Sequence, residues 1–555
     1  MIKKQLFFYI VFFVFVCSVS YAQVSIGGAI DDSFKKDYRN VPFPRDKNAQ
    51  LIDNKELLEN LSEDVNTVKV YVKSFEFVGN RIFDKDKLYS VIKDFTDRSL
   101  TFNELEKVAA IVTDFYRKQG YIISYAYIPP QVIENDTVII AVAEGFIGDV
   151  IVEGNSKYSE EFIEKHIEPL KTGLILNISS LERVLLILNS YNGLTVRASL
   201  KPGIKSGSSD IVLHLQESKT YNVFVALDNY GNKETSRYRL NTSGSIGNLF
   251  LSGDRFSAYF SMGLDNFKPQ NLLFGMADYS IIYGGQGLRL GIAYARSQYK
   301  ASDNFEILDL NGYSDEYSVY SEYPLILKSK VTANLLGNFK IKNSKDKLLG
   351  KRNTADGVYT VSGAVVGSFF PWQGGAGYYL LSFTQGLNPV FNGSHNSKGS
   401  SRPDAGGFFE KFYLEGAFYQ NIFSTLRLNF YVSGQYASEE MFASEKFYIG
   451  GVYSVRGCEN GVNSGDHGLR ISAELESEIY IPQISALVFY DKGWVKNRSV
   501  KYAGYKDASL DSAGVGIRIY PFKGFTVKLD YGVPISASRE KTDSGTFYGR
   551  ISYDF

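Results

Sequence analysis

The 555-residue chain has little cysteine, tryptophan, methionine or histidine, with two, two, four and four copies respectively. Cys17 lies in an N-terminal apolar segment that we expect to be removed, so Cys458 would have no intramolecular disulfide partner. The histidines show no ligand spacing and no carboxylate-rich calcium loop is present, so the sequence predicts neither a metal site nor a cofactor. The formal net charge is zero, which gives no electrostatic reason to expect a nucleic-acid partner.

Long apolar runs are also missing. Residues 1–22 have the features of a secretory signal peptide: a basic start, an apolar run from Leu6 to Val16 and small residues at Ser20 and Ala22. No later stretch approaches the roughly 18 apolar residues of a membrane-spanning helix. The mature chain is therefore expected to be either a soluble β-protein or a β-barrel, because only helices and closed barrels span membranes.

Tyrosine, phenylalanine and glycine are abundant, with 40, 40 and 51 copies. From Tyr221 onward apolar and polar residues alternate in one segment after another, as in strands that divide lipid from an aqueous lumen. Short turns are expected near 283–286, 323–325, 371–375, 421–424, 481–483 and 520–524, and longer loops near 299–313, 342–356, 387–407, 437–468, 495–508 and 534–545. The pattern predicts a transmembrane antiparallel β-barrel of about 16 strands over residues 219–555, rather than a soluble sandwich.

The last ten residues fit that fold. Odd positions, including Tyr553 and Phe555, form an apolar face, and even positions form a polar face. A terminal aromatic after such a strand resembles the signal that delivers bacterial barrels to the barrel assembly machinery. We therefore expect an outer-membrane location, with membrane lipids around the barrel.

Residues 68–145 and 146–218 repeat one pattern of strand, helix, helix, strand and strand. The first helices are expected to begin near Asp84 and Ser159. The second helices are expected to open with the capping boxes Thr101/Glu104 and Ser179/Glu182 and to end at Gly120 and Gly193. The sequence predicts two small α/β domains before the barrel. Residues 23–67 are polar, with a short helical patch at 51–61, and are expected to be a linker that plugs the pore or a disordered tail.

The loop at 437–468 carries the most specific motif, followed downstream by a second one. The loop residues are Gly450, Gly451, Val455, Arg456 and Gly457, and the strand residues are Phe489, Asp491 and Gly493. Phe489 and Asp491 share a strand face, so we expect Arg456 to reach into the lumen and pair with Asp491 in bidentate geometry, rather than solvate the surface. Cys458 is expected to be a small buried side chain rather than a redox switch. Ser464, Asp466 and His467 lie close in sequence, but no nucleophile elbow surrounds them, so we do not expect an enzyme.

These two motifs resemble the paired signature of barrels that carry POTRA domains, a superfamily related to BamA. The order and length of the chain resemble the two-partner-secretion transporters, the ShlB/FhaC/HecB-like haemolysin secretion proteins. A further motif, which resembles that of the first POTRA domain, consists of Gly120, Tyr121, Pro129, Pro130 and Gln131. The family usually has an aromatic residue after Arg-Gly where this chain has Cys458, which puts the packing of the loop tip in doubt.

The resemblance implies two periplasmic POTRA domains that recognise a large, β-rich exoprotein through its N-terminal secretion domain. The exoprotein would then pass unfolded through the barrel to the cell surface. The alternatives are a factor that inserts other barrels into the membrane, and a barrel enzyme or small-solute porin.

Overall fold

The computed structural model describes residues 69–555, except 155–156, 233–234, 266–271, 302, 373, 500–506 and 538–544. The predicted signal peptide and the predicted linker or plug lie outside the described residues. The described part divides into two compact units with a boundary between Ser218 and Lys219. None of its helices has the length and apolar character needed to cross a membrane.

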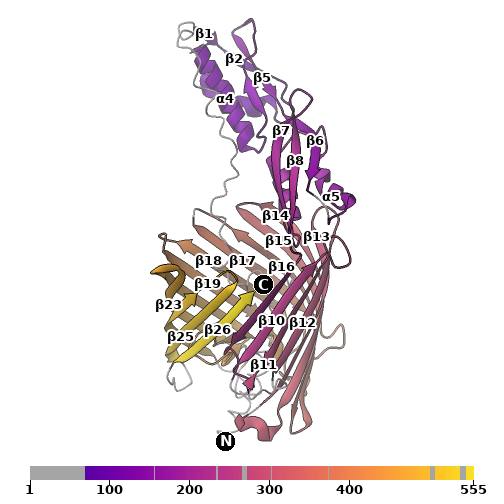
Figure 1. Cartoon of the computed structure of the whole chain (residues 1–555), viewed down its shortest axis with the longest axis vertical. Helices are drawn as coiled ribbons and strands as arrows, with labels where there is room; N and C mark the ends of the chain where they lie inside the picture. Colours follow the sequence, from indigo (N-terminus) through magenta and orange to yellow (C-terminus); the bar gives the residue numbers. More distant parts are fainter. Residues whose placement is uncertain are drawn as a thin grey trace. The chain divides into compact units, whose positions relative to one another are not determined.

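The first unit contains two modules with the same sheet order. The elements of the first module are β1 Lys69–Val72, β2 Ser74–Val78, α3 Lys85–Ile92, η3 Lys93–Phe95, β3 Arg98–Thr101, α4 Phe102–Lys118, β4 Tyr125–Tyr127 and β5 Thr137–Ala143. Those of the second module are β6 Phe146–Glu153, α5 Glu160–Ile167, η4 Glu168–Leu170, α6 Ile178–Leu188, β7 Leu194–Pro202 and β8 Ser208–Glu217. In each sheet the last strand is central, parallel to the first strand and antiparallel to the other (β2-β5-β4 and β6-β8-β7). Figure 1 shows α4 packed along the first sheet.

The turn after the first strand shows how closely the two modules correspond. Gly79 and Gly154 both have positive φ, at 84° and 85°. A Cβ on Gly79 would lie 2.4 Å from the Val142 carbonyl oxygen, and one on Gly154 would lie 2.4 Å from that of Leu215. Only glycine tolerates both the conformation and the close approach. The repeat seen in the sequence is therefore a repeat of backbone geometry.

Most predicted helix boundaries are confirmed. Asp84 and Ser159 cap α3 and α5, and Thr101 and Glu104 form the capping box of α4. The second capping box is wrong, because Asn177 rather than Ser179 caps α6 and accepts from the Ser179 backbone N–H at 2.9 Å.

Two further details of the modules differ from the sequence prediction. Gly193 is not the helix stop, since α6 ends at Leu188 and Gly193 lies in the turn before β7. The single strand expected at the start of the 68–145 repeat is split into β1 and β2, and β1 pairs with β3 instead of joining the main sheet.

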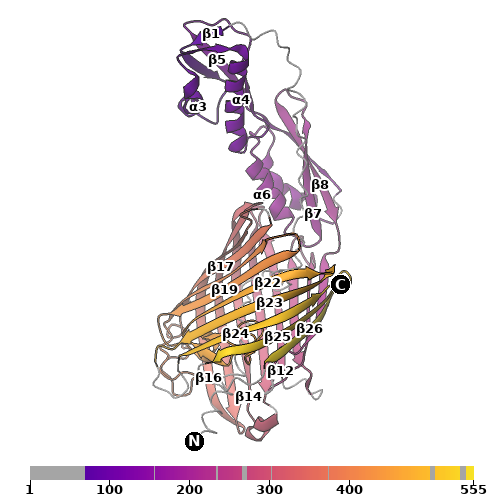
Figure 2. The same cartoon turned by 90° about the vertical axis from the view of Figure 1, so that its left-hand side faces the viewer.

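The second unit is a closed antiparallel barrel of sixteen strands, which confirms the predicted fold and strand number. Its strands are β9 Tyr221–Asp228, β10 Arg239–Gly247, β11 Arg255–Gly263, β12 Leu272–Tyr283, β13 Leu288–Lys300, β14 Asn311–Lys328, β15 Val331–Leu348, β16 Lys351–Phe369, β17 Gly375–Gly386, β18 Glu410–Asn421, β19 Leu426–Ala437, β22 His467–Ile479, β23 Ile481–Lys496, β24 Ala508–Ile519, β25 Phe525–Ala537 and β26 Thr546–Asp554. Figure 2 shows β22 to β26 side by side in one wall.

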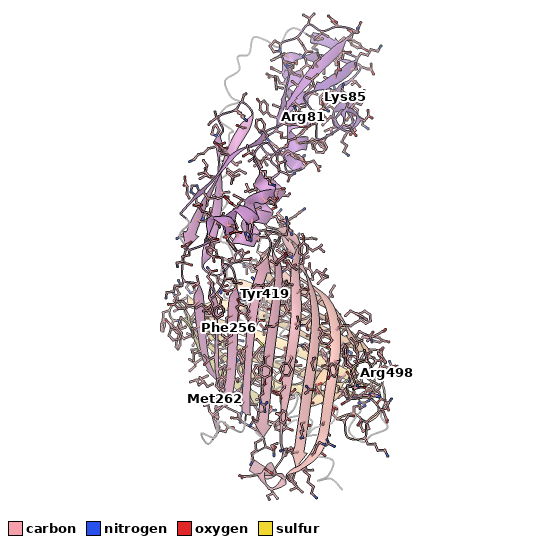
Figure 3. All side chains as sticks on the ribbon, turned by 90° about the vertical axis from the view of Figure 1, so that its right-hand side faces the viewer. Arg81, Lys85, Phe256, Met262, Tyr419 and Arg498 are labelled. Atoms are coloured by element: carbon pink, nitrogen blue, oxygen red, sulfur yellow. The ribbon has the colours of Figure 1, made fainter. Side chains whose placement is uncertain are left out.

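Side chains alternate between the outer and inner faces of the barrel strands. Phe256 and Met262 of β11, both labelled in Figure 3, belong to the outward set. On β26, Phe547 and Ile551 are about half exposed, whereas Tyr548 is buried in the interior. Such strands separate an apolar exterior from a polar interior, as the sequence alternation predicts.

The connections differ at the two ends of the barrel. The end where the chain enters at Lys219, here called the turn end, has the connections 329–330, 480 and 520–524 among others; the opposite loop end has 301–310, 387–409 and 438–466. Two predicted connections are wrong. Residues 342–356 are mostly strand, because β15 continues to Leu348 and β16 starts at Lys351. The turn at 323–325 lies instead at 329–330, and Pro324 marks a bulge inside β14.

The joint that closes the barrel is short. β26 pairs with β9 through five residue pairs, from Arg550↔Asp228 to Asp554↔Phe224, whereas β14 and β15 form seventeen pairs. Beyond the last pair, the side-chain amide of Asn229 donates to the Phe547 carbonyl at 3.0 Å and accepts from the Gly549 N–H at 2.8 Å. The Asn229 backbone N–H also donates to the Gly549 carbonyl at 3.2 Å, so the backbone and the side-chain amide together extend the joint past its last residue pair.

Candidate functional site

The loop between β19 and β22 folds into the barrel as a hairpin. It contains η8 Ala443–Glu445 and the paired strands β20 Phe447–Ile449 and β21 Asn463–Gly465. Gly450 and Gly451, with φ of 105° and 96°, lie in the turn after β20. The Gly451 N–H donates to the Val455 carbonyl at 3.0 Å, so the chain turns back tightly before Arg456. The glycines predicted from sequence therefore form the bend that presents the arginine.

Arg456 lies at the centre of a buried ion network. Its Nε donates to Asp491 Oδ2 at 2.7 Å and its Nη2 donates to Asp491 Oδ1 at 2.8 Å, which is a bidentate pair. Its Nη1 donates to Glu474 Oε1 at 2.7 Å, and Asp530 Oδ2 lies 4.0 Å from the same nitrogen. Arg456 is 5% exposed and Asp491 is fully buried. One cation thus joins carboxylates from β22, β23 and β25.

The neighbouring strands leave space for this arrangement. The Arg456 guanidinium lies over the Phe489 ring, 3.4 Å from its centroid, which adds a cation–π contact. A Cβ on Gly514 of β24 would lie 2.3 Å from Phe489 Cζ, so only glycine accommodates the ring there. A Cβ on Gly493 would lie 3.0 Å from side-chain carbons of Ile449 and Val455. Phe489 and Gly493 therefore position the hairpin by shape, beside the charge pair.

The backbone after Arg456 presses against β25. Gly457 has φ of +89°, and a Cβ on it would lie 2.8 Å from the carbonyl carbon of Gly532. The next residue, Cys458, is buried, as predicted, in an apolar cluster that includes Val455 and Leu510. At the position where the related barrels usually have an aromatic residue, the small thiol packs in a cluster of aliphatic side chains that also includes Phe447 and Tyr413.

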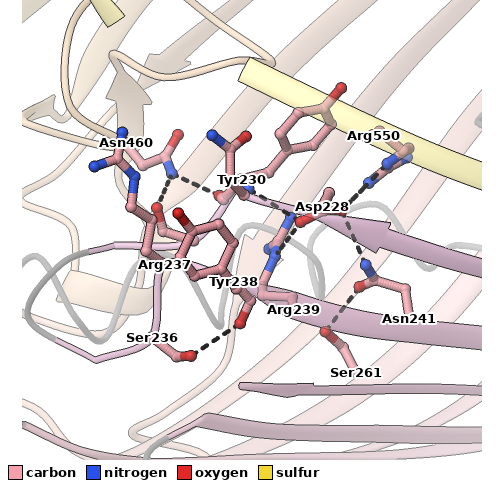
Figure 4. A network of polar contacts seen from close by, with 12 residues as sticks. Asp228, Tyr230, Ser236, Arg237, Tyr238, Arg239, Asn241, Ser261, Asn460 and Arg550 are labelled. Atoms are coloured by element: carbon pink, nitrogen blue, oxygen red, sulfur yellow. Dashed lines mark hydrogen bonds and ion pairs between the residues drawn. The ribbon is translucent and has the colours of Figure 1, made fainter. Parts of the chain in front are cut away.

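The hairpin tip also touches the closing joint of the barrel (Figure 4). Asn460 Nδ2 donates to the carbonyl of Tyr230 at 2.7 Å, directly after β9. Asp228 binds Arg239 of β10 and Arg550 of β26, at 2.9 and 2.7 Å. Arg550 in turn donates to the Tyr453 hydroxyl at 2.8 Å. The loop therefore spans from the β22–β23 wall to the β26–β9 joint.

Two further ion networks hold the base of the loop. Glu445 of η8 is bound by Lys342 of β15 at 2.9 Å and by Lys411 of β18, and all three side chains are buried. Arg402 of the 387–409 loop contacts Glu440 at 3.0 Å and Asp466 at 3.4 Å. These contacts connect the loop to β15 and β18 and to the 387–409 loop.

The structure does not bring Ser464, Asp466 and His467 together as a catalytic triad. Asp466 Oδ1 accepts from the Met441 N–H at 2.9 Å, and the His467 ring packs against Tyr436. Both side chains are therefore engaged in holding the loop.

The predicted POTRA residues fall into two places in the first unit. Gly120 follows α4 with φ of +94°, and its carbonyl accepts from the Ile178 N–H at 2.9 Å, which links the two modules. The Tyr121 ring packs edge-on against Phe83. The Gln131 side-chain amide donates to the Ile139 carbonyl at 2.8 Å and accepts from its N–H at 2.7 Å, so it acts as a strand neighbour to β5. Pro129 and Pro130 line a cavity of about 370 Å³ beside it.

The C-terminal aromatics lie on the outer side of the barrel. The Tyr553 and Phe555 rings are 4.6 Å apart, and Phe555 is 66% exposed. The Phe555 N–H donates to the Val223 carbonyl at 2.9 Å, beside the closing joint. The structure leaves both rings available on the surface.

Glu474, Asp530 and Ser472 were not named as partners of Arg456 from sequence. All three face the interior at alternate positions of their strands, which is the signal that could have identified them. Ser472 Oγ donates to Asp491 Oδ1 at 2.6 Å and accepts from Arg456 Nη2 at 3.2 Å. The register of β22 to β25, which sequence does not specify residue by residue, brings them together.

Comparisons with known proteins agree with this architecture. Residues 207–519 match the family model described as haemolysin secretion/activation protein ShlB/FhaC/HecB, and residues 70–145 match the ShlB-type POTRA domain. The heme/hemopexin transporter protein HuxB of Haemophilus influenzae is 26% identical over 478 residues, covering 83% of each chain. The outer membrane transporter CdiB of Dickeya dadantii is 23% identical, covering 78% of each chain.

A solved structure of CdiB from Escherichia coli superimposes with a TM-score of 0.77 at 20% identity, covering 89% of this chain and 92% of CdiB, and thus shares its fold. The family model covers more than half of this chain and includes most of the barrel, the Arg456 hairpin and the Asp491 strand. This chain therefore belongs to the ShlB/FhaC/HecB family of haemolysin secretion/activation proteins, outer-membrane β-barrel transporters with periplasmic POTRA domains.

Proposed function

We propose that this protein exports one partner exoprotein, captured by the POTRA modules in the periplasm and passed unfolded through the barrel. A sixteen-strand barrel is of the size that encloses an aqueous channel in porins. The observation that carries the proposal is an open β-edge in the second module, which offers an extended polypeptide a place to bind.

The two modules differ in how open their edges are. On β4, the Ala126 N–H donates to Thr113 Oγ1 of α4 at 2.9 Å, so the helix covers the middle of that short edge. On β7, Asn189 covers only Val196, through bonds of 2.7 and 3.0 Å. Alternation then directs the backbone N–H groups of Ala198 and Leu200 outward from the sheet.

An added strand would bond to these groups without disturbing the core. Main-chain bonds of this kind give affinity with little dependence on sequence, while neighbouring pockets supply specificity. We infer that a β-rich partner pairs with β7 at residues 198–202.

The hairpin supplies the second part of the mechanism. Arg456 fixes its tip against β22, β23 and β25, and the Glu445 and Arg402 networks fix its base. Water and a transiting polar chain can replace these ion pairs, whereas the apolar cluster around Cys458 has to separate when the hairpin moves. We infer that the hairpin guards the lumen and that its anchored position defines the path of the exported chain.

The test is an export assay with Ala198→Pro and Leu200→Pro, each of which removes one outward N–H while leaving the pairs with β8 intact. Leu200→Ala is the matched control, since it changes the side chain but keeps the N–H. We expect proline to abolish export and binding of the partner's N-terminal domain, and alanine to preserve both. Normal export by both proline variants would contradict recognition at β7. Deletion of 69–217 should leave a folded barrel that exports nothing; normal export by that deletion would contradict POTRA-dependent secretion altogether.

A further inference from the structure

The outer face of β13 to β16 changes character in regular rows from the middle of the wall to the loop end. Strand register defines each row as four neighbouring residues, one from each strand. The rows are Ile292–Val319–Phe339–Val361, then Tyr294–Tyr317–Ile341–Tyr359, then Arg296–Asp315–Asn343–Gly357, then Gln298–Tyr313–Lys345–Ala355, and last Lys300–Asn311–Lys347–Arg352. A mainly aliphatic row and a mainly aromatic row are thus followed by three polar rows that contain five cations in total.

The aromatic row marks the edge of the hydrocarbon region. Tyr294 and Tyr317 are exposed on the outside with their rings 5.0 Å apart, as in the aromatic girdle of a membrane barrel. Lys345 and Lys347 follow Ile341 by four and six residues. With a rise of about 3.3 Å per residue and a tilt near 40°, they lie roughly 10 and 15 Å beyond the girdle. Figure 2 shows β14 and β16 reaching far toward this end.

That height decides which headgroup can reach the cations. The headgroup layer of a phospholipid bilayer adds only about 5–7 Å on each side of the hydrocarbon core. Phosphates of an ordinary phospholipid would therefore lie below Lys345 and Lys347. Phosphates on the sugar core of an outer-leaflet glycolipid extend farther from the hydrocarbon, to the level of these rows.

Not all five cations are available. Arg296 is paired with Asp315 at 2.9 Å and lies over the Tyr313 ring. Lys300 is paired with Asp309 at 3.3 Å. Within the described part of the chain, Lys345, Lys347 and Arg352 form no ion pair.

The three available cations converge on one patch. Lys345 and Lys347 are two residues apart on one strand face, about 6.6 Å. A register shift between Asp346 and Lys347 brings the exposed Arg352 opposite Lys347. Two point charges and one guanidinium fork at this spacing suit a phosphate group.

A comparable outward position on β23, Lys492, lacks this unpaired positive charge. On β23, outward-facing Lys492 is bound to Asp511 at 3.0 Å, and the Tyr490 hydroxyl donates to the same carboxylate. The charge of Lys492 is thus partly neutralised by Asp511, whereas Lys345, Lys347 and Arg352 have no ion-pair partner among the described residues.

We propose that Lys345, Lys347 and Arg352 form a binding site for the phosphorylated sugar core of lipopolysaccharide in the outer leaflet. The site holds the β15–β16 hairpin against the membrane surface. It is independent of the export path, which runs through the lumen on the other side of the wall.

The test compares purified full-length protein with the triple variant K345Q/K347Q/R352Q, using immobilised lipopolysaccharide that carries core phosphates. We expect affinity to fall about 100-fold, given the contribution of each cation near an anionic surface. The matched control is K328Q/K330Q/K523Q, which removes three exposed cations at the turn end and should bind normally. The variant K345R/K347R/R352K keeps the charge and should also bind, and heat-modifiable mobility shows that each barrel is folded.

Two further arms identify the ligand. Lipopolysaccharide with its core phosphates removed should bind wild type and K345Q/K347Q/R352Q equally weakly. Inorganic phosphate at matched phosphate concentration should not compete; full competition would assign the site to free phosphate and overturn the lipid proposal. Equal binding of intact lipopolysaccharide by wild type and K345Q/K347Q/R352Q would overturn it as well.

Discussion

Removal of the Arg456 side chain should release the hairpin without unfolding the barrel. Arg456→Ala leaves Asp491 and Glu474 buried without their cation, while Asp530 keeps Arg518 at 2.6 Å. Breaking a buried ion pair by deleting one partner costs about 3–5 kcal/mol. At 1.4 kcal/mol per factor of ten, the undocked fraction of the hairpin should rise by roughly 10²- to 10³·⁵-fold. The backbone hydrogen bonds between the barrel strands are not affected by this substitution.

Cys458 provides the assay. It is 8% exposed, lies two residues from Arg456, and is the one cysteine outside the predicted signal peptide. The rate of maleimide labelling therefore reports how often the hairpin leaves its site. We expect Arg456→Ala and Asp491→Ala to label at least about a hundredfold faster than wild type, and both to export poorly, with heat-modifiable mobility retained. Lys492→Ala is the matched control, because Lys492 neighbours Asp491 but faces outward.

Conservative changes refine the same prediction. Arg456→Lys keeps the charge but cannot bind Asp491 through two donors while also reaching Glu474, so an intermediate labelling rate is expected. The exchange Arg456→Asp with Asp491→Arg should not rescue export, since the new carboxylate would face Glu474. Parental labelling and export rates in both alanine variants would refute the view that this network anchors the hairpin.

Three more predictions follow from other contacts. Gly457→Ala should speed Cys458 labelling, because its Cβ would lie 2.8 Å from the Gly532 carbonyl carbon at a positive φ. The control Gly399→Ala, whose Cβ meets only Ser397 Oγ at 4.0 Å, should leave the labelling rate unchanged. Equal labelling rates in the two variants would argue against a close backbone contact at Gly457. Glu445→Gln should expose the 438–446 segment to protease by leaving Lys342 and Lys411 without their shared carboxylate, at a cost of roughly 3 kcal/mol, while exposed Glu410→Gln should have no effect. Burial lowers the pKa of His166, whose ring is hydrogen-bonded to the Phe162 carbonyl and the Tyr191 hydroxyl. As the pH falls, His166 is therefore protonated in the unfolded state before it is protonated in the folded state. The free energy of unfolding of the second module should fall by up to about 1.4 kcal/mol per pH unit below about pH 6.5. Hydrogen exchange of α5 and α6 in the full-length protein measures this slope, which His166→Gln should remove.

The barrel could be predicted from sequence because lipid imposes alternation on each strand. That signal ends where the lipid ends. Beyond Ile341 the outward residues Asn343, Lys345 and Lys347 are polar, as are the inward ones, so the sequence pattern there predicts a loop instead of a strand. Pro324 predicts a turn because it has no backbone N–H, yet a bulge accommodates it inside β14.

The Arg456 site, too, could be predicted only in part from the sequence. Its pair with Asp491 could be predicted from two motifs, because each motif carries one member of the pair. Glu474 and Asp530 join through the register of four strands, β22 to β25, and single-sequence patterns do not specify register. Asn177 caps α6, although Ser179 and Glu182 have the spacing of a capping box two residues later and so predict the wrong cap.

The short β26–β9 joint makes formation of this barrel a ring-closure reaction. Asn229 and Gly549 are 320 residues apart, and closing such a loop costs about 2.5 kcal/mol more entropy than joining strands about 20 residues apart. Five residue pairs must offset that difference, helped by Asp228 and its two arginines. We therefore expect the sheet to assemble hairpin by hairpin and to remain open, with β9 and β26 as bare edges, until this last step. During biogenesis those two edges are the ones that need protection from pairing with other chains.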